Sequence, residues 1–516
     1  MDHPGNTRKF SDAQRTIQAL RDKGVQFWIE NDTLRYRAPR GSVTLDDMTN
    51  LCRSEAGVLS LLIERRETRR FEPYLVRRAA PRSAPLGYSQ LGHWNSRAMA
   101  GHRPIRQVAS ATRLQGRMDV GALKEAFSVV VSRHDAFRTR VVIDNRGDPA
   151  QEIVPWREPN LKLVDLSGIS SSDRAAEFQR HIDSAIIEVK DYVADPLAAT
   201  LLLNLGRDDN VLALAMDHIV SDGASLSIVF GELMTAYTQL IHGDSILLSP
   251  VRMKLADYAA WQRTELPAWL EGRSSEWDSW GLTRFPEDTS NSGAVGWGLE
   301  RLVIDSRAKS DLSKWARSRG TSLAMTVLGA YVALLSRWCE SSEVVVQFIS
   351  DGRMSRLLEN TVGDLTFPIY LRIGAGKDET LVGLLESITK EYCRASEKPE
   401  FGYAFTQNPL PDLVRNPSFN WIPHREHYAN PSASRLRSGL SCSNVSFENP
   451  ALGAFEWDGG PSVTFWENSD EVISEVSFSR KRFSCSLMGR FMVNLRVFLD
   501  VLLTKPTMPI RDVALI

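Results

Sequence analysis

The chain has 516 residues, more than one compact core usually holds, so we expect more than one domain. Its 43% hydrophobic residues and thirteen tryptophans exclude a disordered chain. With 62 basic and 63 acidic residues it lacks a global charge that would attract nucleic acid or an anionic membrane. The start is polar without a secretory apolar core, and the longest apolar stretch, 323–335, is too short to span a bilayer. Five scattered cysteines without CxxC spacing predict free thiols in a reducing cytoplasm.

Residues 8–66 are predicted to form a small module with the order helix, hairpin, helices. Two aromatic-rich runs, 25–29 and 33–37, flank turn residues, which predicts a β-hairpin. Thr44 with Asp47 opens the next helix. Residues 67–84 are rich in Arg, Pro and Ala without a clear period and are predicted to be a linker; a basic recognition patch is the less favoured alternative.

The stretch 211–241 carries the first candidate for chemistry. Residues 211–216 form an apolar run of strand length, and apolar residues at helical spacing follow from 225 to 241. At the corner between them lie His218, which can exchange a proton near neutral pH, and Asp222, which needs a basic partner if it is buried. Gly223 would permit a sharp turn there. Taken alone, a histidine beside a strand is more often a structural polar residue than a catalyst.

The rest of the large region divides into two α/β halves of similar size, 85–265 and 266–516. In the first half a helix ends near residue 131 and runs into a strand. The second half begins with a strand at 299–304 and a helix at 308–319, after which Ser322 caps a long apolar helix. Residues 344–349 are predicted to form another strand.

Several strings in this order resemble one family. His218-x-x-x-Asp222-Gly223 is similar to the HHxxxDG signature of condensation domains of nonribosomal peptide synthetases, which belong to the chloramphenicol acetyltransferase-like superfamily. Residues 133–141 resemble the family's RHExLRTxF motif, and residues 363–372 resemble GxFVNTLPLR. Residues 87–94 match the opening SxAQxRLW motif in part. Residues 23–28 and 34–39 resemble the N-terminal β-hairpin (TubC-type) docking domain of synthetase subunits.

This resemblance implies a small α+β docking domain followed by a pseudo-dimer of two acetyltransferase-like α/β halves with a central tunnel. It implies transfer of a polyketide or peptidyl acyl chain from a carrier protein to an amine or hydroxyl acceptor, forming an amide or ester, with chain release as one use. The acyl chain would arrive as a phosphopantetheine thioester, so no bound cofactor is expected. If Ile516 ends the natural chain, no adenylation, carrier or thioesterase region follows it, and the expectation is a free-standing enzyme.

The resemblance also implies roles for residues near the signature. His218 would orient the nucleophile and accept its proton, and the backbone N–H near Gly223 would face the developing oxyanion. Asp222 is expected to form a structural ion pair, with Arg353 as the first choice of partner and Arg138 as the second.

Three further residues are expected to line the tunnel. Asp217 replaces the first His of HHxxxDG, and Phe367 stands where the family has Asn; Ser221 is the third. His134, within the second motif, is expected to be structural. The two replacements leave open a catalytically degenerate scaffold as an alternative, and an acyltransferase that uses soluble acyl-CoA is another.

Partners follow from the same resemblance. A hairpin edge can add an extended peptide as a further strand. The predicted docking residues would favour the acidic C-terminal tail of an upstream carrier-bearing subunit, with a solvated basic face as the alternative; they are Lys23, Trp28, Arg35, Arg37 and Arg40. The acceptor would come on a second carrier or as a free small molecule. His424 and His427 lack further ligands nearby, so no metal site is expected.

Overall fold

The structure is a computed structural model of the whole chain. It describes residues 16, 19–20, 26–30, 33–37, 44, 47, 83–99, 107–188, 197–264, 282–288, 296–353, 355–376, 378–396, 415–422, 437–445, 460–468 and 470–516. The chain forms two compact units, Met1–Val76 and Arg77–Ile516, and the division between them falls inside the range predicted as a linker.

In the first unit, the predicted hairpin is present. Strands β1 (Gln26–Glu30) and β2 (Thr33–Arg37) pair antiparallel, with Trp28 opposite Arg35 and Gln26 opposite Arg37. Thr44 and Asp47 form the predicted capping arrangement, because Thr44 N donates to Asp47 Oδ2 at 2.8 Å and Asp47 N donates to Thr44 Oγ1 at 3.2 Å. Lys23 and Arg40 lie outside the described residues.

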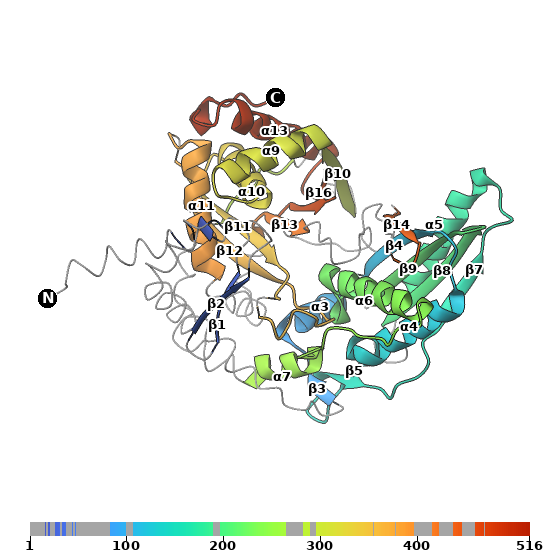
Figure 1. Cartoon of the computed structure of the whole chain (residues 1–516). Coiled ribbons are helices and arrows are strands. Elements are labelled where there is room, and N and C mark those ends of the chain that lie inside the picture. Colours follow the sequence, from blue (N-terminus) through green and yellow to red (C-terminus); the bar gives the residue numbers. More distant parts are fainter. Residues whose placement is uncertain are drawn as a thin grey trace. The chain divides into compact units, whose positions relative to one another are not determined.

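The second unit contains a five-stranded sheet with the order β14-β4-β9-β8-β7. Its strands are β4 (Gln107–Gln115), β7 (Leu161–Asp165), β8 (Ala198–Gly206), β9 (Asp209–Asp217) and β14 (Ser441–Asn444). Helices α4 (Val120–Arg133) and α6 (Gly223–Ile241) pack together beside this sheet (Figure 1). Helix α5 (Ser171–Glu188) also lies beside the sheet.

The central strand β9 explains the apolar run at 211–216. Leu212, Leu214 and Met216 join the core formed with α4 and α6, while Val211, Ala213 and Ala215 join a second core that includes α5. A strand covered on both faces has no solvent side, so it reads as a continuous apolar run rather than an alternating one.

A six-stranded sheet with the order β10-β16-β15-β13-β11-β12 occupies the C-terminal part. Its strands are β10 (Trp297–Ile304), β11 (Glu343–Ser350), β12 (Phe367–Gly374), β13 (Ser418–Ile422), β15 (Ser462–Glu467) and β16 (Val472–Ser479). The accompanying helices are α9 (Ser306–Ser318), α10 (Leu323–Trp338), α11 (Leu381–Ser396) and α13 (Cys485–Thr504). Ser322 caps α10 as predicted, by accepting a bond from Met325 N at 3.2 Å.

The two halves are not independent, because β14 comes from the second half but pairs with β4 of the first. A three-stranded sheet of β3 (Ser83–Pro85), β6 (Pro149–Ile153) and β5 (Thr139–Ile143) completes the strands. Helix α3 (Tyr88–Met99) follows β3 in the chain, and helix α7 (Leu255–Thr264) follows α6. The architecture is the predicted mixed α/β class.

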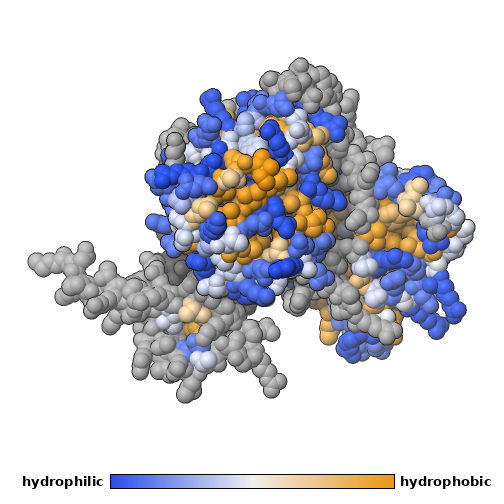
Figure 2. Space-filling view, turned by 90° about the horizontal axis from the view of Figure 1, so that it is seen from above, coloured by the Kyte–Doolittle hydropathy of each residue, from blue (hydrophilic) through white to orange (hydrophobic). Residues whose placement is uncertain are grey.

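On the face that Figure 2 shows, apolar residues gather in patches and polar residues surround them. Among the exposed apolar residues are Leu299 and Val303 of the edge strand β10 and Val493 of α13. None of the helices within the described ranges is long and apolar enough to span a bilayer.

Candidate active site

His218 lies where strand β9 ends. It begins a short 3₁₀ turn, η2 (His218–Val220), which separates β9 from α6. Asp217 caps this turn by accepting a hydrogen bond from Ile219 N at 3.0 Å, and Ser221 Oγ donates to the Asp217 carbonyl at 2.9 Å. The His218 side chain keeps 23% of its surface exposed, so the imidazole is accessible rather than sealed in the apolar core.

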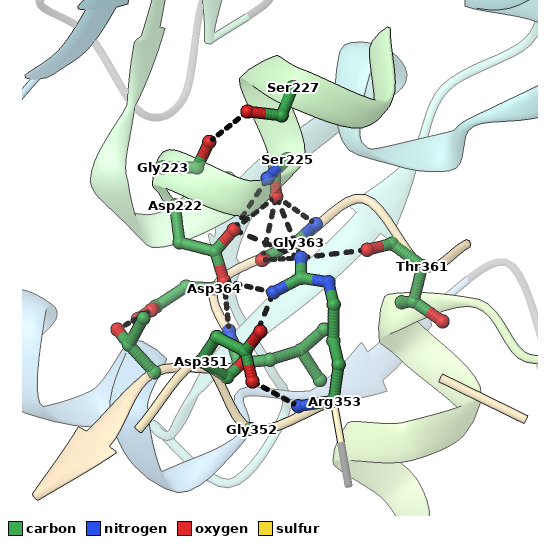
Figure 3. Close-up of polar contacts among 12 residues, drawn as sticks. Asp222, Gly223, Ser225, Ser227, Asp351, Gly352, Arg353, Thr361, Gly363 and Asp364 are labelled. Atoms are coloured by element: carbon green, nitrogen blue, oxygen red, sulfur yellow. Dashed lines mark hydrogen bonds and ion pairs between the residues drawn. The ribbon is translucent and has the colours of Figure 1, made fainter. Parts of the chain in front are cut away.

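Asp222 is the N-cap of α6 and forms the predicted ion pair with Arg353 (Figure 3). Arg353 Nη1 donates to Asp222 Oδ2 at 2.8 Å and Nη2 donates to Oδ1 at 2.9 Å, a bidentate geometry. The capping bond comes from Ser225 N, 2.7 Å from Oδ1. The side chains of Asp222 and Arg353 are 0% and 3% exposed, so this is a buried pair.

The pair holds a loop of the second half against the start of α6. Residues 351–366 connect β11 to β12, and Leu365 N donates to Asp222 Oδ2 at 3.2 Å. Gly363 N donates to Ser225 Oγ at 3.0 Å. Gly352 has a φ of +66°, and a Cβ there would lie 1.9 Å from Leu365 O, so the loop closes on itself only with glycine at this position. We call residues Asp222, Ser225, Arg353, Gly363 and Leu365 the clamp.

The same loop delivers Asp364 to His218, a contact that the sequence did not predict. Asp364 Oδ1 lies 3.7 Å from His218 Nδ1, and Oδ2 lies 3.2 Å from His93 Nε2. The Asp364 side chain has no exposed surface. Ser89 Oγ donates to Oδ2 and Thr366 Oγ1 donates to Oδ1 at 2.8 Å. The rings of His93 and His218 stack, with centroids 4.4 Å apart and an interplanar angle of 25°. We call Ser89, His93, His218 and Asp364 the imidazole cluster.

Burial raises the pKa of Asp364, but the charges and hydrogen bonds of its neighbours outweigh this effect. His93 acts through charge and a hydrogen bond, His218 through charge and Ser89 through a hydrogen bond, and together they hold the pKa of Asp364 below its usual range. The carboxyl group is therefore ionised near neutral pH.

One face of α3 supplies the remaining contacts. Ser89, His93 and Arg97 are spaced four residues apart, so they form one row on the helix. Ser89 and His93 contact Asp364, while Arg97 Nη1 lies 3.9 Å from Asp217 Oδ2. Gln90 Nε2 donates to the Ile219 carbonyl at 2.8 Å, which ties α3 to the His218 turn. The i, i+4, i+8 spacing was the available signal in the sequence.

The three residues expected to line a tunnel are buried. Asp217, Ser221 and Phe367 are 2%, 0% and 3% exposed. Asp217 is held by its own turn and by Arg97, and Ser221 bonds back to Asp217. Phe367 begins β12. In this structure these side chains are packed, and the expectation that they face an open passage is corrected.

Gly223 is the first residue of α6 and is exposed. It is not among the glycines with positive φ, and a Cβ at this position would meet no atom within 4 Å. The turn that we expected Gly223 to make is instead made by η2 and by the extended Asp222, whose φ is −140°. Glycine here leaves open space at the N-terminal end of α6, the end where backbone N–H groups favour negative charge.

Two further residues that the sequence analysis named, Arg138 and His134, have partners other than Asp222 and His218. Arg138, the second choice of partner for Asp222, instead donates to Asp135 Oδ1 at 2.6 Å and to the Val154 carbonyl at 3.0 Å. His134 is buried with Nε2 2.9 Å from Glu232 Oε2, consistent with a structural role.

The remaining histidines and cysteines bear on metal-binding and redox alternatives. His424 and His427 lie outside the described residues. Among the residues described, His93, His218 and Asp364 bring one potential ligand atom each within 4.8 Å of one another. The four cysteines that the structure describes form no disulfide; they are Cys339, Cys393, Cys442 and Cys485.

Two family profiles match the chain. The Condensation domain profile matches residues 81–516, and the TubC N-terminal docking domain profile matches residues 15–64. Malpibaldin synthetase of Mortierella alpina is 25% identical over 455 residues, which cover 84% of this chain and 8% of that protein. Surfactin synthase subunit 1 of Bacillus subtilis (strain 168) is 24% identical over 419 residues, which cover 79% and 11%. The chain thus spans about a tenth of the length of these relatives.

Solved structures share the fold. The X-domain from teicoplanin biosynthesis has a TM-score of 0.68 at 20% identity, covering 86% of this chain and all of that one. The first condensation domain of the calcium-dependent antibiotic synthetase, in complex with a substrate analogue, has a TM-score of 0.65 at 18% identity, covering 84% and 99%. These similarities confirm the predicted fold.

Proposed function

Because the chain belongs to the condensation domain family, we propose that it transfers an acyl chain from a carrier-protein thioester to an amine or hydroxyl acceptor. The observation that carries this proposal is the partly exposed His218 imidazole, which has a buried carboxylate against Nδ1 and the open N-terminal end of α6 nearby. This arrangement offers a proton acceptor together with backbone N–H groups that favour a negative oxygen.

In the proposed step, the acceptor nitrogen or oxygen attacks the thioester carbonyl carbon. His218 Nε2 takes the proton from the nucleophile, and the carbonyl oxygen becomes an oxyanion near the Gly223 N–H. When the carbon–sulfur bond breaks, the phosphopantetheine sulfur leaves as a thiolate and takes the proton back from His218. Atoms and charge balance without a further reagent or cofactor.

We further propose that the β1–β2 hairpin receives an acidic C-terminal tail of the protein that carries the donor. The match to the docking-domain family and the Trp28–Arg35 and Gln26–Arg37 registers of the hairpin support this proposal. Reversing the charge in an Arg35→Glu, Arg37→Glu variant should weaken binding of a carrier with an acidic tail at least tenfold. Binding of the same carrier without its tail should be unchanged, and equal losses for both carriers would rule out tail capture.

The test of transfer is intact-protein mass spectrometry of an acyl-loaded carrier mixed with the chain and candidate amine and hydroxyl acceptors. The proposal expects loss of the acyl mass from the carrier only when both chain and acceptor are present. A parallel reaction offers the same acyl group on coenzyme A. Efficient turnover of acyl-CoA without a carrier would favour the soluble-donor acyltransferase instead.

A second candidate is a condensation-like scaffold without turnover. Asp217, which replaces the first His of the signature, favours this candidate. The similarity in fold to the X-domain from teicoplanin biosynthesis also favours it, because another solved structure shows that X-domain in complex with OxyB. Stable binding of the carrier with no transfer to any acceptor in the same assay would support the scaffold and overturn the enzymatic proposal.

A further inference from the structure

Asp364 is a carboxylate without exposed surface that contacts two imidazoles at once. An ionised carboxylate only accepts hydrogen bonds, so each ring nitrogen that faces it is favoured in its protonated form. His93 Nε2, 3.2 Å from Oδ2, is accordingly an N–H donor. The negative charge 3.7 Å from His218 Nδ1 favours the proton on that nitrogen as well, although this separation is an ion-pair distance rather than a hydrogen bond.

The position of the proton on His218 decides what the ring can do. In a neutral imidazole one nitrogen carries the proton and the other has the lone pair. With the proton on Nδ1, facing Asp364, the lone pair is on Nε2. In the opposite tautomer, the lone pair of Nδ1 would face a buried negative charge and Nε2 could not accept a proton.

His93 restrains the same ring from a second direction. Its ring stacks on that of His218 at 4.4 Å while its Nε2 holds Asp364, so one side chain fixes both partners. The helix that carries His93 is tied to the His218 turn through Gln90, and the loop that carries Asp364 is tied to α6 through Arg353. The helix comes from the first half of the chain and the loop from the second.

We propose that Asp364 and His93 are positioning residues for His218. Asp364 holds the imidazole in the tautomer that leaves Nε2 as proton acceptor, and His93 holds Asp364 and limits rotation of the ring. This inference rests on the proposed function for the use of Nε2, but the tautomer itself is independent of any substrate.

The first test reads the tautomer of His218 by ¹⁵N NMR of the full chain labelled at histidine, with the signal assigned by its absence from a His218→Gln variant. We expect the Nδ1–H tautomer in the wild type and a shift towards Nε2–H in Asp364→Asn. Asp135→Asn, which removes another buried carboxylate that is paired with Arg138, should leave the His218 signal unchanged. An Nε2–H tautomer in the wild type, or no response to Asp364→Asn, would overturn the proposal.

Two substitutions of His93 separate its contributions. His93→Gln can retain an N–H donor but loses the stacked ring, whereas His93→Phe retains a ring but loses the donor. We expect His93→Phe to shift the tautomer more than His93→Gln, because the donor holds Asp364. Equal wild-type signals in both variants would remove His93 from the proposal.

The second test is steady-state kinetics with a loaded carrier. Asp364→Asn should lower kcat by about 10- to 100-fold, less than the roughly 100- to 10,000-fold attributed to a general base, and leave KM for the carrier within twofold. If the tautomer follows Asp364 but no variant or wild type transfers acyl groups, the proposed function fails and the positioning stands. If transfer occurs but kcat is unchanged in Asp364→Asn, the positioning fails alone.

A zinc titration of the wild type completes the test, because the same three side chains lie within 4.8 Å at their ligand atoms. We expect no stoichiometric Zn²⁺ binding and the same kcat with and without a chelator. Stoichiometric binding that is lost in Asp364→Asn, together with chelator-sensitive turnover, would make the cluster a metal site and overturn the proposal.

Discussion

Two buried carboxylates lie at the start of α6 and on the loop packed against it, and they are neutralised in different ways. Asp222 receives a bidentate guanidinium, a backbone N–H of the loop and its own capping bond. Asp364 receives two hydroxyl groups and faces two imidazoles. Both carboxylates have no exposed side-chain surface.

The difference lies in the partners. A guanidinium remains charged at any pH that a protein experiences and forms a fixed fork, so the clamp is suited to holding structure. Imidazoles gain and lose protons near neutral pH, so the cluster is suited to moving one. The clamp fixes the loop on which Asp364 lies. The ion pair of Asp222 with Arg353 therefore helps to hold Asp364 against His218.

Breaking the clamp should have the largest effect on stability. Asp222→Ala or Arg353→Ala leaves one buried charge without its partner, which costs about 3–5 kcal/mol. We expect this loss in the unfolding free energy measured by urea denaturation. A matched control is Arg140→Ala, since the Arg140–Glu152 pair is 40% and 34% exposed and should contribute only about 0–1 kcal/mol. Equal losses for the two pairs would contradict a structural clamp.

Removing the tie between α3 and the His218 turn should have the next largest effect. Gln90 is 1% exposed, donates to the Ile219 carbonyl and accepts from Gly87 N at 2.9 Å. Gln90→Leu leaves those backbone groups without these bonds, at about 1–3 kcal/mol for a buried unsatisfied group. Denaturant unfolding checks this value, and a loss below about 0.5 kcal/mol would mean that other contacts hold α3.

Acid titration sharpens the comparison for Asp364. Because the pKa of Asp364 is below its unfolded value of about 3.9, its contribution to stability is present above that pH. The contribution is lost as pH falls through the folded pKa. The groups that face it are His93, His218, Ser89 and Thr366. We expect unfolding free energy to fall less steeply with acid below about pH 4 in Asp364→Asn than in the wild type; parallel curves would contradict the lowered pKa.

The smallest effect on stability is expected at Gly223. A Cβ there meets no atom, and alanine is favoured over glycine within helices by up to about 1 kcal/mol, so Gly223→Ala should be as stable as the wild type or slightly more stable. If the acyl group occupies the open space, kcat/KM should nevertheless fall severalfold. Unchanged stability with unchanged kcat/KM would place the reacting carbonyl elsewhere.

The sequence predicted what local pattern and recognised motifs encode. The hairpin came from two aromatic-rich runs that flank turn residues, the strand at 211–216 from a continuous apolar run, and the helix that follows from apolar residues at helical spacing. The Asp222–Arg353 pair followed from the family resemblance together with the need to compensate a buried charge. Asp222 lies within a motif that could be read from the chain, and Ser225 begins the helical pattern directly after it.

The imidazole cluster could not be predicted in the same way. Asp364 is separated from His218 by 146 positions in the numbering, the difference between 364 and 218, and it stands at the variable second position of the string that resembles GxFVNTLPLR. Ser89 and His93 lie within the string that matches the opening motif only in part, and that motif assigns them no role. The row at 89, 93 and 97 indicated a shared helix face, but only tertiary structure shows what that face contacts. Burial of Asp217, Ser221 and Phe367 likewise depends on packing that local sequence does not determine.

The most direct test of the account is the single-turnover rate of acyl transfer from a saturating loaded carrier in His218→Ala. His242→Ala, at the exposed far end of α6, is the matched control and should match the wild type. We expect a rate about 100- to 10,000-fold lower for His218→Ala in a protein that still folds. A His218→Ala rate within threefold of the wild type would contradict it.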